Sequence, residues 1–459
     1  MRIPATPPNA DALYWRFIER LAAAEESGRQ TLTRFLASIG PTDPSGRYLH
    51  WEDFRFRPPP EGLDPQTAWA LTRMARKRLQ KTTPFHDVVG QSFSYVPVEH
   101  ILKSLHSIDS EAHGGLRFAA PAPSENEAKN FLVKSLIEEP FNSSLLEGAA
   151  TTREEAKRLI REHKRPATEG ERMVLNNYRA IEFIKARQND PLTIELIHQL
   201  HRIITDRTLE NLEKSGRFRS AADDINVVDD IDNKILHKPP SATELPLRMQ
   251  AICDFANAPS DSDGFTHPIL RAIILHFMLA YDHPYVDGNG RTARALFYWS
   301  VLRDGYWLLE YVSISRIINK APISYGQAFL QTETDGADLT YFLLHQLDVI
   351  VKSIDDLSTF IHMKQESVRS LAVQIESSAN RHRLNHRQIS LLHDAIRNPD
   401  VTYTIREQEQ LHHVSYLTAR SDLERLATLG YLLKSRRGQQ SIYRPAHRLH
   451  QKILHAAAP

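Results

Sequence analysis

At 459 residues, the chain exceeds the size at which one hydrophobic core usually stops growing, so we expect two or three domains. Its 41% hydrophobic and 25% charged residues are typical of a globular protein and argue against a disordered or fibrous chain. Lys and Arg (57) nearly balance Asp and Glu (56), and the resulting net charge of +1 excludes a whole-molecule attraction to nucleic acid or to anionic membranes.

Cysteine usage and hydropathy limit the compartment. Cys253 is the only cysteine, which excludes an intrachain disulfide and a cysteine-rich zinc site and favours a reducing environment. The most apolar run, residues 272–281, is too short to span a bilayer, and the sequence "MRIPATPPNA" lacks the apolar core of a signal peptide. We therefore expect a cytoplasmic protein without a membrane partner.

Residues 1–115 are predicted to form an N-terminal region of mixed or uncertain structure. The stretch "DALYWRFIERLAAA" (11–24) predicts a helix, and prolines at 58–60 and a basic stretch at 74–81 follow it. These residues suggest no chemistry. Gly114 and Gly115, with the turn-rich "APAPSENE" after them, indicate a domain boundary.

Residues 116–350 carry a strongly helical pattern. Thr152 and Glu155 form a capping-box signature in "TTREEAKRLI", which predicts a helix start there. Residues 217–240 interrupt the pattern, because β-branched runs flank "DDIDNK" and predict a β-hairpin that ends at a proline pair. Further helices are predicted over 192–205, 244–257 and 338–354.

The stretch "HPYVDGNGRTAR" (283–294) separates two predicted helices. The first, residues 267–282, is apolar nearly all round, so we expect it to be a central buried helix that ends before Pro284. The second is predicted to begin near Asn289. Its core-facing side is expected to comprise Ala293, Leu296, Phe297 and Val301.

The charge at the start of the second helix is unusual. Arg291 and Arg294 lie three residues apart on one side of its first turns, where positive charge opposes the helix dipole by about 0.3–1 kcal/mol. A bound anion reverses the sign of that effect. Gly288 and Gly290 remove side chains that would keep a phosphate from the backbone amides. The stretch therefore predicts a polyphosphate site.

Two further residues of this stretch suggest chemistry. Asp287 is a candidate Mg²⁺ ligand, because Mg²⁺ usually takes one or two carboxylates and completes its shell with water and phosphates. His283, with an ordinary pKa near 6.5, is a candidate general base. Each residue alone could serve a turn or a helix cap, but together they favour transfer of a phosphorus-containing group from a nucleotide.

The same stretch resembles the signature of the Fic (Fido) family, His-x-Phe-x-Asp/Glu-Gly-Asn-Gly-Arg-x-x-Arg, with Tyr285 in place of the usual phenylalanine. We expect the tyrosine to be tolerated if its hydroxyl finds a partner. The resemblance implies a protein adenylyltransferase that moves AMP from ATP to a Ser, Thr or Tyr hydroxyl of a target protein, the enzyme itself included. It assigns His283 as general base and Asp287 as magnesium ligand. The implied phosphate-binding residues are Gly288, Asn289, Gly290, Arg291 and Arg294.

The resemblance extends to two other segments. It implies that the hairpin over Ile225–Lys238 is a flap that aligns the target by strand addition. The predicted flap residues are Ile225, Val227, Val228, Ile235 and His237. It also implies an inhibitory helix near 142–149, where "SSLLEG" supplies Ser143, Glu147 and Gly148. There Glu147 would pair with Arg294 and displace the ATP γ-phosphate; the alternative is an ordinary solvated glutamate.

The end of the chain differs in charge. Residues 351–382 are predicted to be a helical linker, and from Arg381 onward thirteen basic and six acidic residues give a net charge of +7. Three predicted helices followed by two strands over 383–459 resemble a winged helix-turn-helix domain. Leu417, Leu423 and Leu426 are expected in its core. The candidate DNA contacts are Arg420, Arg425, Lys434, Arg436 and Arg437.

The expected fold class is therefore mainly α: a Fic/Fido helical core with a β-hairpin flap and a C-terminal winged helix-turn-helix domain. Two alternatives to AMP transfer stay open. One is a DNA-binding transcriptional regulator whose core senses nucleotide, and the other is an enzyme that removes AMP from a modified protein. ATP, a protein target, DNA and a second copy of the chain are the candidate partners.

Overall fold

The computed structural model describes most of the chain. The described residues are 1–112, 136–161, 164–229, 232–259, 264–382, 384–397, 401–412, 414–437, 440–449 and 451–453. The chain divides into two compact units, residues 1–357 and 358–459, and each is described by itself. Within the described ranges, each helix is either too short or too polar to cross a bilayer.

The first unit begins with helices and one β-hairpin. These elements are α1 (Ala10–Ala23), α2 (Glu26–Ser38), α3 (Trp51–Phe54), α4 (Pro65–Leu79), β1 (Lys81–His86), β2 (Ser92–Tyr95) and α5 (Glu99–Ala112). Helix α1 confirms the predicted helix, and the Asn9 side chain caps it by accepting a hydrogen bond from the Ala12 amide (3.0 Å). The hairpin was not predicted, since Pro84 argues against a strand; the pairing is irregular between Thr82 and His86, which accommodates it.

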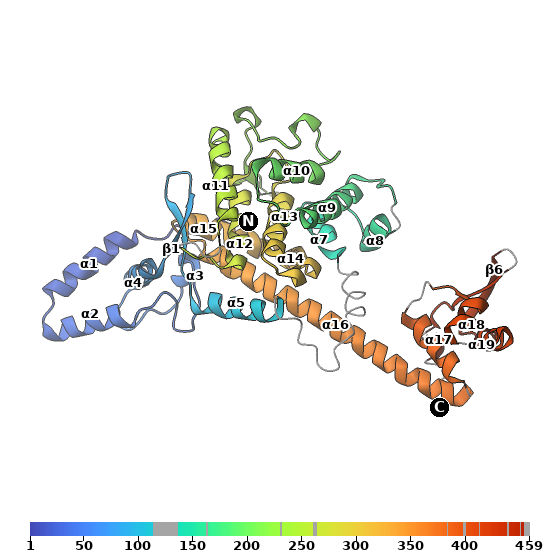
Figure 1. Cartoon of the computed structure of the whole chain (residues 1–459). Helices are drawn as coiled ribbons and strands as arrows, with labels where there is room; N and C mark the ends of the chain where they lie inside the picture. Colours follow the sequence, from blue (N-terminus) through green and yellow to red (C-terminus); the bar gives the residue numbers. More distant parts are fainter. Residues whose placement is uncertain are drawn as a thin grey trace. The chain divides into compact units, whose positions relative to one another are not determined.

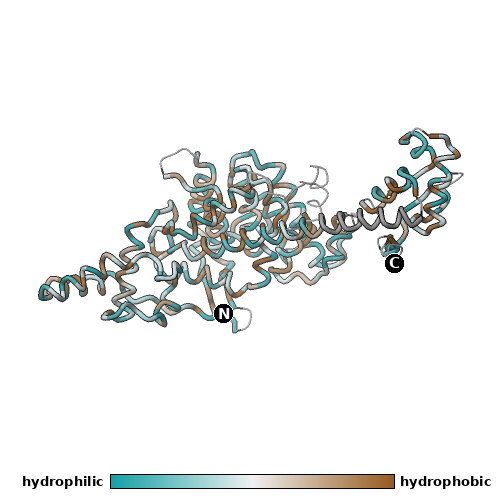
Figure 2. The backbone as a smooth tube through the Cα atoms, turned by 90° about the horizontal axis from the view of Figure 1, so that it is seen from below, coloured by the Kyte–Doolittle hydropathy of each residue, from teal (hydrophilic) through white to brown (hydrophobic). Residues whose placement is uncertain are grey.

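The rest of the first unit is a helical bundle. Its helices are α7 (Glu138–Leu146), α8 (Arg153–Arg161), α9 (Glu169–Ala186), α10 (Ile194–Ile204), α11 (Leu245–Asn257), α12 (Pro268–Asp282), α13 (Asn289–Arg303), α14 (Ile314–Lys320), α15 (Pro322–Thr334) and α16 (Thr340–His382). Helices α12 and α13 lie in its middle (Figure 1), where hydrophobic residues are concentrated (Figure 2). Almost every residue of α12 is buried, which confirms the predicted central helix. The predicted inward side of α13 is buried as well.

Several predicted details of the bundle are confirmed. Thr152 and Glu155 form the capping box of α8, because the Glu155 amide donates to Thr152 Oγ1 (3.3 Å) and the Thr152 amide donates to Glu155 Oε2 (3.1 Å). The helices predicted over 192–205, 244–257 and 338–354 are α10, α11 and the first part of α16. The predicted boundary at Gly114 and Gly115 lies outside the described residues. Helix α16 runs through residue 350 without a break, so the stretch predicted as a linker continues this helix.

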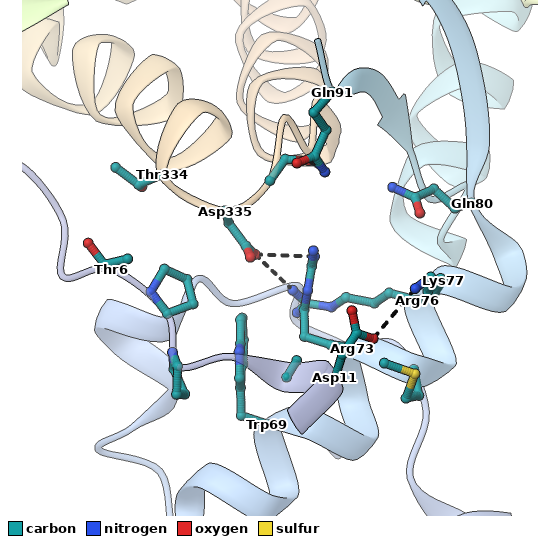
Figure 3. A pocket seen from close by; sticks show the side chains of 15 residues that line it. Thr6, Asp11, Trp69, Arg73, Arg76, Lys77, Gln80, Gln91, Thr334 and Asp335 are labelled. Atoms are coloured by element: carbon teal, nitrogen blue, oxygen red, sulfur yellow. Dashed lines mark hydrogen bonds and ion pairs between the residues drawn. The ribbon is translucent and has the colours of Figure 1, made fainter. Parts of the chain in front are cut away.

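A charge network attaches the N-terminal helices to the bundle. Arg73 Nη1 of α4 lies 3.3 Å from Asp335 Oδ2, and the almost fully buried Arg76 lies 3.8 Å from the same carboxylate (Figure 3). Arg73 Nη1 also lies 3.2 Å from Asp338 Oδ2. Arg73, Arg76 and Asp335 help to line a cavity of about 290 Å³, whose walls contain none of residues 283–294. Because two arginines face two aspartates, the network is balanced, and we attribute its role to packing.

The predicted hairpin is also present. Strands β3 (Val227–Val228) and β4 (Ile235–His237) pair antiparallel, with Val227 opposite His237 and Val228 opposite Ile235. Residues 230 and 231 of the connecting turn lie outside the described residues. This hairpin is the segment predicted to be the flap.

The described part of the second unit contains helices and a three-stranded antiparallel sheet. Its elements are α17 (His386–Arg397), β5 (Tyr403–Thr404), α18 (Ile405–His412), α19 (Tyr416–Thr428), β6 (Leu432–Arg437) and β7 (Gln440–Pro445), with the strands in the order β5-β7-β6. Strand β5 was missed because two residues carry no periodicity. Leu423 and Leu426 are in the core as predicted. Leu417 is 74% exposed, so its predicted core position is wrong; nine residues at about 100° each place it half a turn away from Leu426.

Candidate active site

The turn after α12 has an unusual backbone at His283. This residue has φ +45°, in the left-handed region that non-glycine residues seldom occupy, and Arg219 stabilises the turn by donating from Nε to His283 O (2.7 Å). His283 Nδ1 lies 3.3 Å from Ala280 O. Because a carbonyl only accepts, Nδ1 carries the proton in this contact and Nε2 keeps a free lone pair. Burial lowers the pKa of His283 to about 4, so the ring is neutral at pH 7.

The glycines of the turn allow close approach to the start of α13. Gly288 has φ +79°, and a Cβ there would lie 2.8 Å from Thr205 Cγ2. The positive φ makes Gly288 a position that favours glycine, and a Cβ at Gly290 would overlap Glu147 Oε1 in this arrangement of the Glu147 side chain. Asn289 does not point into the cradle: its side chain accepts from the Tyr285 amide (2.9 Å) and donates to Tyr285 O (2.8 Å), which fixes the shape of the turn.

The two arginines of α13 are both buried. Arg291 and Arg294 are each 2% exposed. Arg291 Nη2 donates to Asp287 Oδ2 (3.0 Å), while its Nε and Nη1 are buried without a hydrogen-bond partner among the described residues. A buried guanidinium with unused donors is costly unless an anion completes it. Asp287 itself is half exposed at the mouth of the turn.

Arg294 is bound instead by α7. It donates from Nε to Ser143 Oγ (2.9 Å), and from Nη2 to Ser143 O (3.2 Å) and Glu147 Oε1 (2.7 Å). Glu147 follows the last residue of α7, and Gly148 turns the chain away with φ +83°. Thus the predicted set Ser143, Glu147 and Gly148 meets Arg294, and the Glu147 carboxylate lies against Gly290.

The position of α7 is fixed by the buried carboxylate of Glu139, which sequence reasoning missed. Glu139 accepts from Ser313 Oγ (2.8 Å) and Ser315 Oγ (2.6 Å) at the start of α14. Burial raises the pKa of Glu139, and these hydroxyl bonds oppose that effect. Since Glu139 lies two turns before Glu147, this anchor fixes where the Glu147 carboxylate lies.

Comparison with known proteins agrees with the resemblance of residues 283–294 to the Fic signature. Residues 191–301 match the sequence profile of the Fic/DOC family. The chain contains a Fic domain. Two protein adenylyltransferases Fic are similar to it: that of Drosophila melanogaster is 31% identical over 183 residues (38% of this chain, 32% of that protein), and that of Nematostella vectensis is 27% identical over 197 residues (41% and 42%). The chain therefore matches less than half the length of these relatives.

A solved structure supports the fold. A Fic family protein from Desulfovibrio desulfuricans G20 matches 77% of this chain and 98% of its own, with a TM-score of 0.51 and 19% sequence identity. At this identity the likeness concerns the fold alone.

The Fic domain also contains a histidine that sequence reasoning missed. The His201 ring stacks on Tyr285 with 3.7 Å between ring centroids, and Nε2 lies 2.9 Å from Asp287 O. The Gly216 amide donates to His201 Nδ1 (2.9 Å), so Nε2 carries the proton and donates to Asp287. Burial lowers the pKa of His201 to about 4 and keeps this tautomer neutral. The only sequence signal was a pair of histidines three apart on α10, and His198 of that pair contacts the Tyr285 hydroxyl (3.0 Å).

The flap residues divide between two faces. Val228 and Ile235 are 42% and 51% exposed, while Ile225 and Val227 are partly buried. His237 differs from them, because its side chain is 8% exposed and faces the bundle. A target strand added to the flap would therefore meet the valine and isoleucine side chains and not His237.

Proposed function

We propose that the Fic domain transfers AMP from ATP to a hydroxyl of a protein target. The observation that carries the proposal is a neutral His283 at a strained turn, next to two glycines and two buried arginines. His283 Nε2 takes the proton of the target hydroxyl, the hydroxyl oxygen bonds to the α-phosphorus, and the bond from that phosphorus to the pyrophosphate breaks. The names of the similar adenylyltransferases support this activity.

The phosphates bind at the start of α13 in this proposal. The backbone amides near Gly288 and Gly290 face the phosphates, and the unused donors of Arg291 bind one of them. Arg294 is a second phosphate ligand once Glu147 leaves it. Among the described residues, no group of three His, Cys, Asp or Glu side chains could hold a metal, so Mg²⁺ would rely on Asp287 and the phosphates. A Mg²⁺ ion held there by Asp287 would supply positive charge to the phosphate oxygens.

We propose that α7 inhibits this activity. The Glu147–Arg294 pair withholds a phosphate ligand, and the Glu147 carboxylate lies where a phosphate would approach Gly290. Two like charges cannot share that space at low cost, so Glu147 and the distal phosphate exclude each other. Activity then requires that α7 release Arg294.

A second candidate function concerns the second unit, which we propose to be a winged helix-turn-helix domain that binds DNA. Its net charge supports this, although Lys434 is paired with Glu424 and Arg420 Nε lies 4.0 Å from the same carboxylate. Arg425 and Arg436 are exposed. The side chain of Arg437 lies outside the described part of the chain.

Mass analysis tests the transfer directly. The purified full chain, its Glu147→Gly variant and the Glu147→Gly/His283→Ala variant are incubated with ATP and Mg²⁺, alone and with candidate target proteins. We expect a covalent gain of one AMP in the Glu147→Gly reaction, lost in the double variant. A gain of a phosphoryl group, or AMP transfer that survives without His283, would contradict the proposal; AMP loss from a premodified target would favour the reverse reaction.

A further inference from the structure

His237 of the flap has hydrogen-bond acceptors at both ring nitrogens. Nδ1 lies 2.7 Å from Glu333 Oε2 on α15, and Nε2 lies 2.7 Å from Tyr281 O at the end of α12. A carbonyl oxygen and an ionised carboxylate can only accept, and a neutral imidazole has a single N–H. Both bonds can form together only if His237 is the doubly protonated imidazolium.

The surroundings of His237 suit a cation. Glu333 supplies a negative charge, and Tyr281 O is one of the last carbonyls of α12, which have no amide partner within the helix and lie at its negative end. The Tyr281 ring lies 4.7 Å away, and Asp282 and His283 also interact with His237 electrostatically. Burial alone would lower the pKa of His237, but Glu333 and the Tyr281 carbonyl outweigh burial and raise this pKa.

The same contacts connect the flap to the catalytic turn. Tyr281 precedes His283 by two residues, so His237 ties strand β4 to the end of the helix that carries the general base. Arg219, which lies ahead of the flap, donates to His283 O (2.7 Å), and its amide donates to Pro284 O (2.8 Å). The flap segment and the turn after α12 are thus one hydrogen-bonded assembly.

We propose that the His237 imidazolium is a positioning residue that fastens the flap to the catalytic turn, so that losing one proton from it loosens the flap and weakens target binding. The proposal rests on the proposed AMP transfer for its consequence, but not for the state of the ring. Because the pKa of His237 is raised in the folded protein, the fastening is complete below its unfolded value near 6.5 and is lost as pH rises through the folded value.

The ring itself can be tested without activity. In the full chain with ¹⁵N-labelled histidine, the His237 signals, assigned by their loss in His237→Gln, should show both ring nitrogens protonated at pH 7. Glu333→Gln keeps an acceptor for Nδ1 but removes the charge, so the titration midpoint should move to lower pH. The exposed Glu210→Gln should leave it in place. A neutral single tautomer at pH 7, or no response to Glu333→Gln, would overturn the proposal.

The consequence for the flap has two readouts. Amide hydrogen exchange of residues 225–229 and 232–237, corrected for intrinsic rates, should quicken about tenfold when His237 deprotonates, as expected for loss of one charged hydrogen bond. In a Glu147→Gly background, KM for the target should rise over the same pH range while kcat changes little, and Glu333→Gln should move both transitions to lower pH. The exposed Glu210→Gln should leave both transitions in place.

The two readouts also separate the proposal from the proposed function. If no AMP transfer occurs at any pH, the proposed function fails, while the exchange of the flap amides still decides whether His237 fastens the flap. AMP transfer and titration of the His237 ring could both be observed while neither the exchange of the flap amides nor KM changes with that titration. In that case His237 does not position the flap, and the inference is wrong.

Discussion

A single guanidinium, that of Arg294, determines whether the Fic domain can hold a triphosphate in the proposed way. It makes three hydrogen bonds to α7, of which only the one to Glu147 carries a full opposite charge. Glu147→Gly should raise the rate of AMP transfer by about tenfold or more, since one charge-assisted bond is worth at least that factor. Ser143→Ala removes a neutral bond to the same arginine and should have a smaller effect. Equal effects, or an unchanged rate in Glu147→Gly, would exclude inhibition by this carboxylate.

The protonation of His283 makes a second prediction. Because burial holds its pKa at about 4, the ring is a base above that pH and is lost as a base only below it. The value of kcat/KM should therefore be flat on the acid side down to about pH 5, with no fall near the ordinary value of 6.5. The measurement is kcat/KM between pH 5 and 7 in the Glu147→Gly variant. A tenfold fall per pH unit below 6.5 would show that the working base is not this buried ring.

Tyr285 provides a third prediction. It is fully buried, and its hydroxyl contacts His198 Nδ1 (3.0 Å), which is the partner that the departure from phenylalanine requires. Tyr285→Phe should lower the free energy of unfolding by about 0.5–1.5 kcal/mol and leave AMP transfer intact. Urea denaturation measures the first effect. A loss of more than tenfold in activity would mean that the hydroxyl has a role beyond packing.

Sequence reasoning at this scale succeeded where chemistry is local. His283, Asp287 and the glycines lie within eight residues of one another, so their spacing carried the information. His201 and Glu139 were missed because their partners come from distant segments, Asp287 and Ser315 respectively. The spacing of residues along the chain does not indicate contacts between segments that are distant in sequence. The charge of His237 was equally hidden, because it depends on Glu333 about a hundred residues away.

Among the elements, helices were predicted best because their periodicity extends over many residues. The stretch that became α12 is the clearest case, and the capping box of α8 was found by its spacing. Two strands were not predicted, because β5 has only two residues and β1 contains a proline. The core position predicted for Leu417 is wrong because nine helical residues put it on the side of α19 opposite Leu426.

The capping box makes a prediction at this scale. Thr152→Ala removes the hydroxyl that accepts from the Glu155 amide and should destabilise the start of α8 by about 1 kcal/mol. Amide exchange in the first turn of α8 should quicken about fivefold, while exchange in α12 is unchanged. Exchange that quickens equally in both helices would mean that the substitution acts on global stability instead.

At the scale of the whole molecule, buried neutral histidines should make the protein sensitive to acid. Burial lowers the pKa of His50, His201, His283 and His345 to about 4, and that of His276 to about 3. Because these values lie below the unfolded value near 6.5, their contribution to stability is complete above pH 6.5 and is lost as pH falls toward 4. The thermal midpoint should drop steeply between pH 6.5 and 4.5. A constant midpoint over that range would show that these rings are not buried and neutral.

The DNA binding proposed for the second unit makes a further prediction. The affinity for DNA should fall steeply as the salt concentration rises, and Arg436→Ala should reduce the slope of log affinity against log salt by about one. Arg406→Ala, an equal change of charge on the exposed side of α18, is the control. A mobility shift over a salt series measures both variants. An affinity for DNA that does not change with salt, or an equal loss of affinity in the two variants, would exclude the proposed contact surface.

The central claim, that the turn after His283 directs AMP from ATP to a protein hydroxyl, is tested most directly by the position of a radioactive label. Glu147→Gly is incubated with Mg²⁺ and a protein extract, with ATP labelled in parallel at the α- or the γ-phosphorus. The account predicts that protein acquires the α-label and not the γ-label, and that His283→Ala in the same background abolishes the transfer. Transfer of the γ-label, or an α-label that is independent of His283, would contradict it.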